Sequence, residues 1–127
     1  MASVKRVLFV DDNEDMRLYG RVVLTRAGYQ VETAADGREA MRRLGRTPLP
    51  DVVLSDLNMP ETDGLRLYSL MHEDARLARI PVALCTAGVD DWEARATFGV
   101  PFLPKPGLVP REEFLRELTR FLLRPTS

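Results

Sequence analysis

The feature that most constrains the fold is an alternation of short apolar runs with segments of helical period. The runs are too short for typical helices, and Val7 to Val10 lacks the polar alternation of a strand with one solvated face. Apolar strands that alternate with helices are typical of a doubly wound parallel sheet covered on both faces. We therefore expect an α/β fold with five strands, at Val7 to Val10 and at residues 29–34, 51–56, 80–87 and 100–105.

The segments between these runs carry helix start and stop signals. Asp36 is placed to cap one helix, and Gly28 is placed to end another. Pro110 suits the first turn of the last helix. The segment 89–99, which contains Trp92, has the weakest pattern. Five helices are expected: one that ends at Gly28, one from Asp36 to Gly45, and residues 64–74, 89–99 and 110–123.

The bulk composition excludes several classes of protein. A chain of 127 residues with 45% hydrophobic and 29% charged residues is expected to form a single domain, residues 1–127. The net charge of −1 gives no field that would attract nucleic acid or a membrane surface, so neither is expected as a partner. A lone cysteine, Cys85, excludes an internal disulfide and suits a reducing compartment, and no apolar run is long enough to span a membrane. We therefore expect a cytoplasmic location.

Polar side chains stand where four of the expected strands end. Asp11 and Asp12 follow the first strand, Asp56 the third, Thr86 the fourth and Lys105 the fifth. The carboxyl ends of parallel strands meet at one edge of the sheet, so these groups should converge. Taken alone, an acidic pair before a helix is more often a solvated N-cap, and the other three residues would be ordinary surface groups. The ordered set favours a common site.

Three carboxylates, a hydroxyl and an ammonium suit the transfer of a phosphoryl group. Asp11, Asp12 and Asp56 could share a hard divalent cation, for which Mg²⁺ fits best. A carboxylate can itself be the nucleophile, and Asp56 is the candidate because it is the single acid in the stretch LSDLNMP, which continues from an apolar strand. Lys105 would pair with a phosphate oxygen and Thr86 would donate to another. Only Lys5 and Lys105 are lysines among 18 basic residues, so a lysine at this place is distinctive.

Four stretches of sequence resemble the receiver domain of two-component response regulators, especially the single-domain chemotaxis type: VDDNED, SDLNMPETDG, CTAG and FLPKP. The likeness covers nearly the whole chain, and we expect a single receiver domain without an output domain, which is either a stand-alone receiver or one cut from a longer chain. It implies a flavodoxin-like sheet with strand order 2-1-3-4-5 and a phosphorylation-activated signalling switch that catalyses its own phosphorylation and slow dephosphorylation. It also implies two partners, a sensor histidine kinase or histidine phosphotransfer protein as donor and an unknown downstream protein.

The resemblance also assigns roles to individual residues. Asp56 is implied as the phosphoacceptor, with Lys105 pairing with the phosphate and Thr86 and Phe102 acting as switch residues. Phe102 is otherwise plain core. The bond between Lys105 and Pro106 is implied to be cis. The implied Mg²⁺ ligands are Asp12, Asp56, Asp11 through a water molecule, and the backbone carbonyl of Asn58.

Two other functions compete with the switch. A Mg²⁺-dependent phosphatase with an aspartyl intermediate needs a second acid two residues after the nucleophile, where this chain has Asn58. A binding module that works without phosphorylation has no need of the complete set of site residues. Two departures from the family pattern concern output: the segment from Thr86 to Lys105 is short, and Gly107 replaces a large apolar residue.

Overall fold

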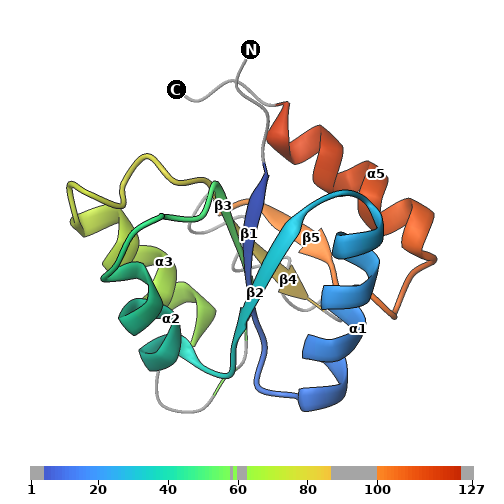
Figure 1. Ribbon diagram of the computed structural model, residues 1–127, viewed down its shortest axis with the longest axis horizontal. Coiled ribbons are helices and arrows are strands. Elements are labelled where there is room, and N and C mark those ends of the chain that lie inside the picture. The colour runs from blue at the N-terminus through green and yellow to red at the C-terminus, as the bar shows by residue number, and fades with distance from the viewer. Residues whose placement is uncertain (1–4, 58, 60–62, 87–99, 124–127) are drawn as a thin grey trace.

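A computed structural model of the chain describes residues 5–57, 59, 63–86 and 100–123. Its centre is a parallel five-stranded sheet with the order β2-β1-β3-β4-β5, as expected (Figure 1). The described strands are β1 (Arg6–Val10), β2 (Gln30–Ala34), β3 (Val52–Asp56), β4 (Val82–Thr86) and β5 (Phe102–Pro104). The described helices are α1 (Glu14–Arg26), α2 (Gly37–Leu44), α3 (Gly64–Glu73) and α5 (Arg111–Leu122).

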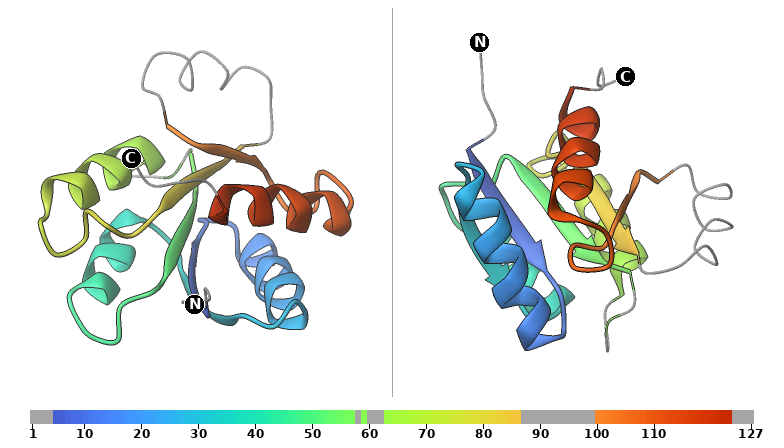
Figure 2. Two further views of the ribbon diagram at one scale, coloured as in Figure 1. Left: turned by 90° about the horizontal axis from the view of Figure 1, so that it is seen from above. Right: turned by 90° about the vertical axis from the view of Figure 1, so that its right-hand side faces the viewer.

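Helices cover both faces of the sheet. In Figures 1 and 2, α1 and α5 lie on one face and α2 and α3 on the other. Because successive strand residues point to opposite faces, Phe9 packs under Leu24 and Phe114, whereas Leu8 packs in the cluster that contains Leu67. This explains why β1 is apolar at every position after its first residue. None of the helices in the described part of the chain combines the length and apolar character needed to cross a bilayer.

Side-chain caps define where three helices begin. Asp36 caps α2 by accepting a hydrogen bond from the Glu39 amide, as the sequence predicts. Asp63 caps α3 in the same way. At α1 the capping residue is Asn13, whose side-chain oxygen accepts from the amide of Met16 at 2.9 Å. The acidic pair that precedes Asn13 is therefore not the helix cap.

The turn after β5 corrects one expectation. The bond between Lys105 and Pro106 is not cis; within the described residues the cis bond joins Thr47 and Pro48. The Leu108 amide donates to the Lys105 carbonyl at 3.1 Å, and Gly107 has a φ of 93°. This is the pattern of a type II turn, which takes a trans proline at its second position and glycine at its third. The turn therefore also explains the unusual Gly107.

The helical period of the sequence predicts that Met16, Tyr19, Val23 and Ala27 lie on one side of α1, facing the sheet, and the structure differs at two of them. Val23 is buried as predicted, but Tyr19 is 39% exposed and Ala27 is exposed as well. Gly20 and Leu24 take their places against the sheet, because a Cβ at Gly20 would lie 2.6 Å from the Phe9 ring. The predicted helix at 89–99, with Trp92, lies outside the described residues, and so does Asn58.

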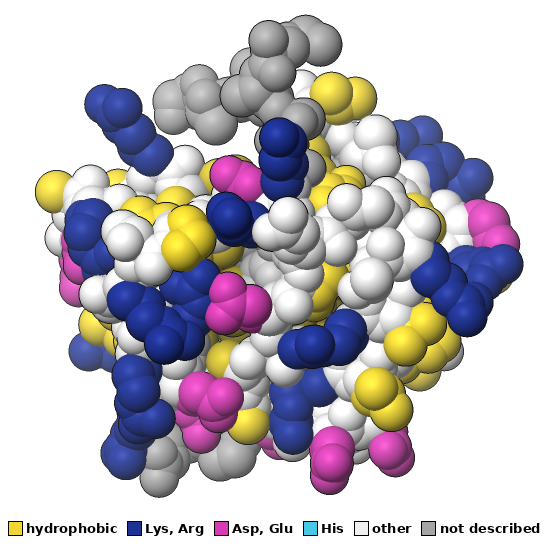
Figure 3. Space-filling view, in the orientation of Figure 1, with side chains coloured by type: hydrophobic (Ala, Val, Ile, Leu, Met, Phe, Trp, Pro, Cys, Tyr) yellow, Lys and Arg dark blue, Asp and Glu magenta, His cyan; other side chains and the backbone are white. Residues whose placement is uncertain are grey.

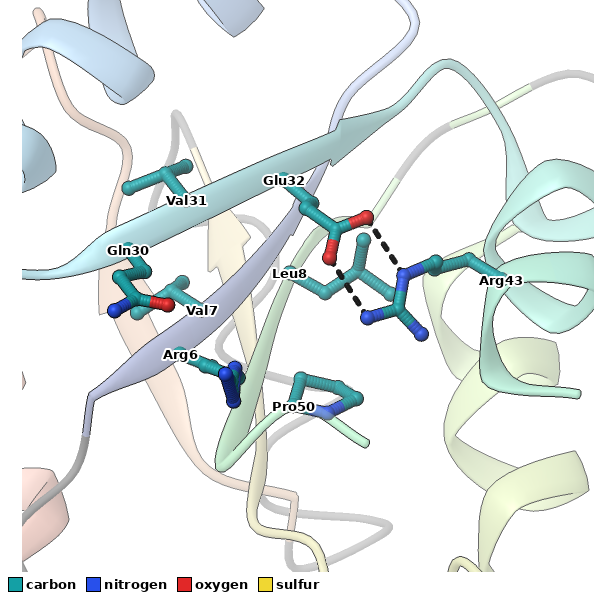
Figure 4. A pocket seen from close by; sticks show the side chains of 8 residues that line it. All are labelled: Arg6, Val7, Leu8, Gln30, Val31, Glu32, Arg43 and Pro50. Atoms are coloured by element: carbon teal, nitrogen blue, oxygen red, sulfur yellow. Dashed lines mark hydrogen bonds and ion pairs between the residues drawn. The ribbon is translucent and has the colours of Figure 1, made fainter. Parts of the chain in front are cut away.

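The basic segment at the end of α2 is only partly a solvated surface. Dark blue and magenta side chains are interspersed over the face shown in Figure 3, and Arg42 and Arg46 are exposed. The side chain of Arg43, however, is only 10% exposed and lies along the edge strand β2. It makes two hydrogen bonds to Glu32, of 2.6 and 2.7 Å, at the rim of a small pocket (Figure 4). Two more bonds reach the carbonyls of Arg46 and Pro48.

Candidate functional site

Three of the predicted site residues meet at the carboxyl edge of the sheet. Asp11 directly follows β1, Asp56 ends β3, and Lys105 directly follows β5. The Lys105 Nζ lies 3.4 Å from Oδ2 of Asp11 and 3.3 Å from Oδ1 of Asp56. One ammonium group therefore bridges two carboxylates that the chain order separates by 45 residues.

Asp11 is almost completely buried, with 1% of its surface exposed. Its amide donates to the Ala34 carbonyl, and its Oδ1 accepts from the Asn13 amide at 2.9 Å. The second oxygen, Oδ2, is buried and has no hydrogen-bond partner among the described residues, although the Lys105 ammonium stands nearby. A buried carboxylate oxygen without a hydrogen bond is costly, so this position favours a cation as its partner.

The electrostatics of the site favour proton or cation uptake. Burial raises the pKa of Asp56, and the neighbouring Asp11 carboxylate raises it further, whereas Lys105 acts in the opposite direction. Burial by itself would lower the pKa of Lys105, but the two carboxylates outweigh it and the pKa is raised. Lys105 is thus held as a cation, while its single charge leaves the acids incompletely compensated.

The acids also satisfy the requirements of a hard metal ion. Asp11, Asp12 and Asp56 each offer one carboxylate oxygen, and these oxygens lie within 4.8 Å of one another. Asp12 is exposed, so the cluster opens to solvent on its side. An all-oxygen donor set that is partly open to water fits Mg²⁺, which retains several water ligands when it binds to proteins. The donor set and the Oδ2 of Asp11, which accepts no hydrogen bond from the described residues, thus fit the predicted ion.

The backbone at Asp56 is held in place by close packing. Its carbonyl accepts a hydrogen bond from the buried Ser55 hydroxyl at 2.9 Å. The amide of Gly64, the first residue of α3, donates to the Leu57 carbonyl at 2.8 Å. A Cβ on Gly64 would overlap the Asp56 carbonyl oxygen, so glycine lets α3 start directly against the strand end. Met59, in the loop between them, is buried.

The remaining predicted residues fall into three groups. Thr86 ends β4, at the same edge of the sheet, but its side chain and the whole of Asn58 lie outside the described part of the chain. Phe102 is half-buried and packs against the cluster of Leu57, Leu84 and Val100. Cys85 is a buried packing residue; burial raises its pKa to about 12, with a further contribution from Asp56, and keeps the thiol protonated.

One polar contact at the site was not predicted. The Arg17 side chain, on α1, donates a hydrogen bond of 2.8 Å from Nη1 to the main-chain carbonyl of Asp11. In the sequence Arg17 has no distinguishing mark, since arginine is the common basic residue of this chain. Its spacing of six residues from Asp11 is the only signal, because the first turn of a helix can return a long side chain to the strand that precedes it.

Comparisons with known proteins agree with this geometry. Residues 7–106 match the model of the response regulator receiver domain. The polar-differentiation response regulator DivK of Brucella anthropi is 33% identical, over 93% of this chain and 96% of its own length. A protein-glutamate methylesterase/protein-glutamine glutaminase of Archaeoglobus fulgidus is 36% identical over 91% of this chain. The present chain spans only 34% of that longer relative.

Solved structures show the same arrangement of the chain. The chemotaxis response regulator CheY4 of Vibrio cholerae has a TM-score of 0.80 and 31% identity, covering 94% of this chain and 99% of its own. The signal receiver domain of a histidine kinase from Syntrophus aciditrophicus has a TM-score of 0.80 and 30% identity, covering 97% and 95%. Both are described as receivers or response regulators of signalling systems.

Proposed function

This chain belongs to the response regulator receiver domain family, and from that premise we propose that Asp56 is its phosphoacceptor. Receiver domains of this family act in phosphorylation-dependent signalling. The observation that carries the assignment is the position of Asp56: a buried carboxylate at a strand end, 3.3 Å from the one lysine of the site. Asp11 also stands at a strand end beside Lys105, but it is more deeply buried than Asp56 and therefore less accessible to a donor. Asp12, which follows it, is exposed.

The proposed reaction is an in-line displacement at phosphorus. An oxygen of Asp56 forms a bond to the phosphorus as the bond to the leaving nitrogen or oxygen of the donor breaks, and the leaving group keeps the electron pair. Lys105 would release part of its interaction with Asp56 and pair with a phosphoryl oxygen. Thr86 would donate to another phosphoryl oxygen and, together with Phe102, pass the change to a partner surface.

The three acids and one main-chain carbonyl would hold the metal ion. Asp12 and Asp56 would be direct ligands, Asp11 would act through water, and the main-chain carbonyl of Asn58 would complete the protein ligands. When bound, Mg²⁺ supplies positive charge that offsets the charge of the transferring phosphoryl group. The protein would contribute the fixed carboxylates and the ammonium, both in place before the donor arrives.

The proposed donor is a phosphohistidine of a sensor kinase or histidine phosphotransfer protein. Its approach is supported by two exposed leucines on the segments that carry Arg17 and follow Lys105. Leu18, on α1, is 62% exposed, and Leu108, in the turn after Lys105, is 57% exposed. The start of α1 and the turn after Lys105 lie close together, as shown by the 3.5 Å that would separate a Cβ at Gly107 from the Tyr19 ring. Exposed leucines next to a polar reaction centre suit a protein donor.

We further propose that the chain is a switch and not an enzyme with steady turnover. Asn58 cannot supply the proton that a phosphatase of the competing type gives to its leaving group. Phosphorylation and slow hydrolysis would then occur on the same carboxylate. A cytoplasmic location and an unidentified downstream protein belong to the same proposal, in keeping with the buried free thiol of Cys85.

Intact-mass spectrometry tests the assignment. The protein is incubated with acetyl phosphate and Mg²⁺, and the mass is expected to rise by one phosphoryl group. Asp56→Asn should abolish this rise. Asp51→Asn is the matched control, because Asp51 is an exposed acid at the opposite end of β3 that binds the amides of Lys5 and Arg6. Equal labelling of Asp56→Asn and wild type would refute Asp56 as acceptor, and continuous hydrolysis of a phosphomonoester would revive the phosphatase.

A further inference from the structure

Arg17 returns from α1 toward the end of β1 and does not extend into solvent. Its Nη1 donates to the Asp11 carbonyl at 2.8 Å, and its own amide bonds to the carbonyl of the capping Asn13. It therefore belongs to the first turns of α1, where the helix dipole disfavours a cation. Building on the function proposed above, we propose that Arg17 is a positioning residue that holds the backbone of Asp12 in the place from which its carboxylate binds Mg²⁺.

Arg17 is connected to Asp12 through one hydrogen bond and one planar peptide group. The carbonyl of Asp11 and the amide of Asp12 belong to one planar peptide group. A hydrogen bond that fixes this carbonyl also fixes the plane, and with it the Cα atom from which the Asp12 side chain departs. Arg17 thus acts on Asp12 through the main chain and does not need to touch its carboxylate.

Asp12 depends on this link more than the other two acids do. The amide of Asp11 and its Oδ1 are held by Ala34 and Asn13, and Asp56 is buried beside Lys105. Asp12 is exposed, and the described residues provide no hydrogen bond to its carboxylate. The position of its Cα atom, from which the carboxylate must reach the metal, therefore rests on the peptide that Arg17 holds.

Positioning and simple electrostatics predict opposite effects of removing Arg17. A cation near the acids repels Mg²⁺, so loss of its charge alone would strengthen metal binding. Loss of the hydrogen bond frees the peptide between Asp11 and Asp12, which would weaken metal binding. The sign of the change in Mg²⁺ affinity therefore separates the two roles, and it is measured without any phosphodonor.

Calorimetric titration of the metal-free full chain with Mg²⁺ alone provides the test. Arg17→Met should bind about tenfold more weakly, as is usual when a group that orients a metal ligand is removed. Arg17→Lys keeps the charge and one donor, so its affinity should be intermediate. Arg21→Met is the matched control, since Arg21 is exposed one turn further along α1, and it should bind at least as tightly as wild type.

Circular dichroism without metal verifies that each variant is folded. Arg17→Met binding as tightly as wild type, or more tightly, would overturn the positioning role, and so would Arg17→Lys binding no better than Arg17→Met. If Arg17→Met does not fold, Arg17→Lys decides: weaker binding with the charge retained supports the role, and unchanged binding refutes it. Failure of wild type to accept a phosphoryl group would instead contradict the assignment of Asp56.

Discussion

Lys105 and Asp56 face each other across the gap between strands that are not neighbours in the sheet, with 3.3 Å between Nζ and Oδ1. The strand between them, β4, contributes Cys85, which stands in register with Asp56. Since Cys85 pairs with Leu103 on its other side, the lysine lies two residues beyond this level and reaches across the line of β4 to the acid. This geometry makes the site sensitive to the loss of one charge.

Lys105→Met should destabilise the metal-free protein at neutral pH. It leaves the carboxylates of Asp11 and Asp56 buried without a cation, and breaking such a pair costs about 3 kcal/mol in free energy of unfolding. Urea denaturation measures the loss. Lys5→Met, which changes the only other lysine at an exposed position, should stay within about 0.5 kcal/mol. Equal stability of Lys105→Met and wild type would show that the ammonium does not compensate the acids.

Asp56→Asn should stabilise the metal-free protein, more so at neutral than at acidic pH. Burial, reinforced by Asp11, raises the pKa of Asp56 above its ordinary value of 3.8. Below that value the Asp56 carboxyl group is protonated in both the folded and the unfolded chain, so it does not reduce the free energy of unfolding. As the pH rises toward the raised pKa, the unfolded chain ionises first and wild type loses stability. Denaturant titrations at several pH values test this, and a gain independent of pH would contradict it.

Gly64→Ala should disturb the acceptor although it changes no polar group. The added Cβ would overlap the Asp56 carbonyl and lie 3.0 Å from the Leu57 Cα, so backbone must move. Overpacking of this kind costs about 1–3 kcal/mol in free energy of unfolding. Thermal unfolding measures the loss, and intact mass after treatment with acetyl phosphate should show slower labelling. An unchanged melting temperature would mean that α3 can withdraw from the strand without penalty.

Arg43→Met should release the edge strand β2 and the loop after α2. It removes four hydrogen bonds, two of them to Glu32, at a cost of about 1–3 kcal/mol in free energy of unfolding. Arg42→Met changes an exposed neighbour of Arg43, and it should alter the free energy of unfolding by less than about 0.5 kcal/mol. Similar losses in the two variants would mean that charge number, and not the contacts of Arg43, is responsible.

Acidification should remove part of the stabilisation that Arg43 provides through its pair with Glu32. The hydrogen bonds from Arg43 lower the pKa of Glu32, so the pair contributes above the ordinary pKa of glutamate. The contribution is lost as the pH falls through the lowered pKa, because the folded state must then accept a proton. The difference in stability between wild type and Arg43→Met should therefore shrink on acidification. If this difference in stability instead grows on acidification, the pair of Arg43 and Glu32 does not stabilise the fold in the way proposed.

The sequence predicts the sheet and much of the site because both follow from strong local signals. Apolar runs define the strands, and the acids of Asp11 and Asp56 and the ammonium of Lys105 stand directly at their ends. The strand order came from the resemblance to receivers, since spacing alone does not determine which strands are neighbours. The structure confirms the sheet with this strand order, and it brings Asp11, Asp56 and Lys105 together.

Contacts made by long side chains could not be predicted in this way. Arg17 and Arg43 are two of many arginines, and only tertiary structure shows which carbonyl or carboxylate each one meets. The trans bond at Lys105 follows from the turn around Gly107, where the local conformation of this chain overrides the family expectation. The exposure of Tyr19 arises because the glycine beside it packs against Phe9.

The most direct test of the central claim locates the acyl phosphate itself. The protein is treated with acetyl phosphate and Mg²⁺, then reduced with borohydride, which converts a phosphorylated carboxyl group into an alcohol, and the modified residue is identified by peptide sequencing in the mass spectrometer. We predict conversion at Asp56 and at no other acid. Conversion at Asp11 or Asp12, or a phosphate that withstands borohydride because it is bound to a hydroxyl, would contradict the proposed acceptor.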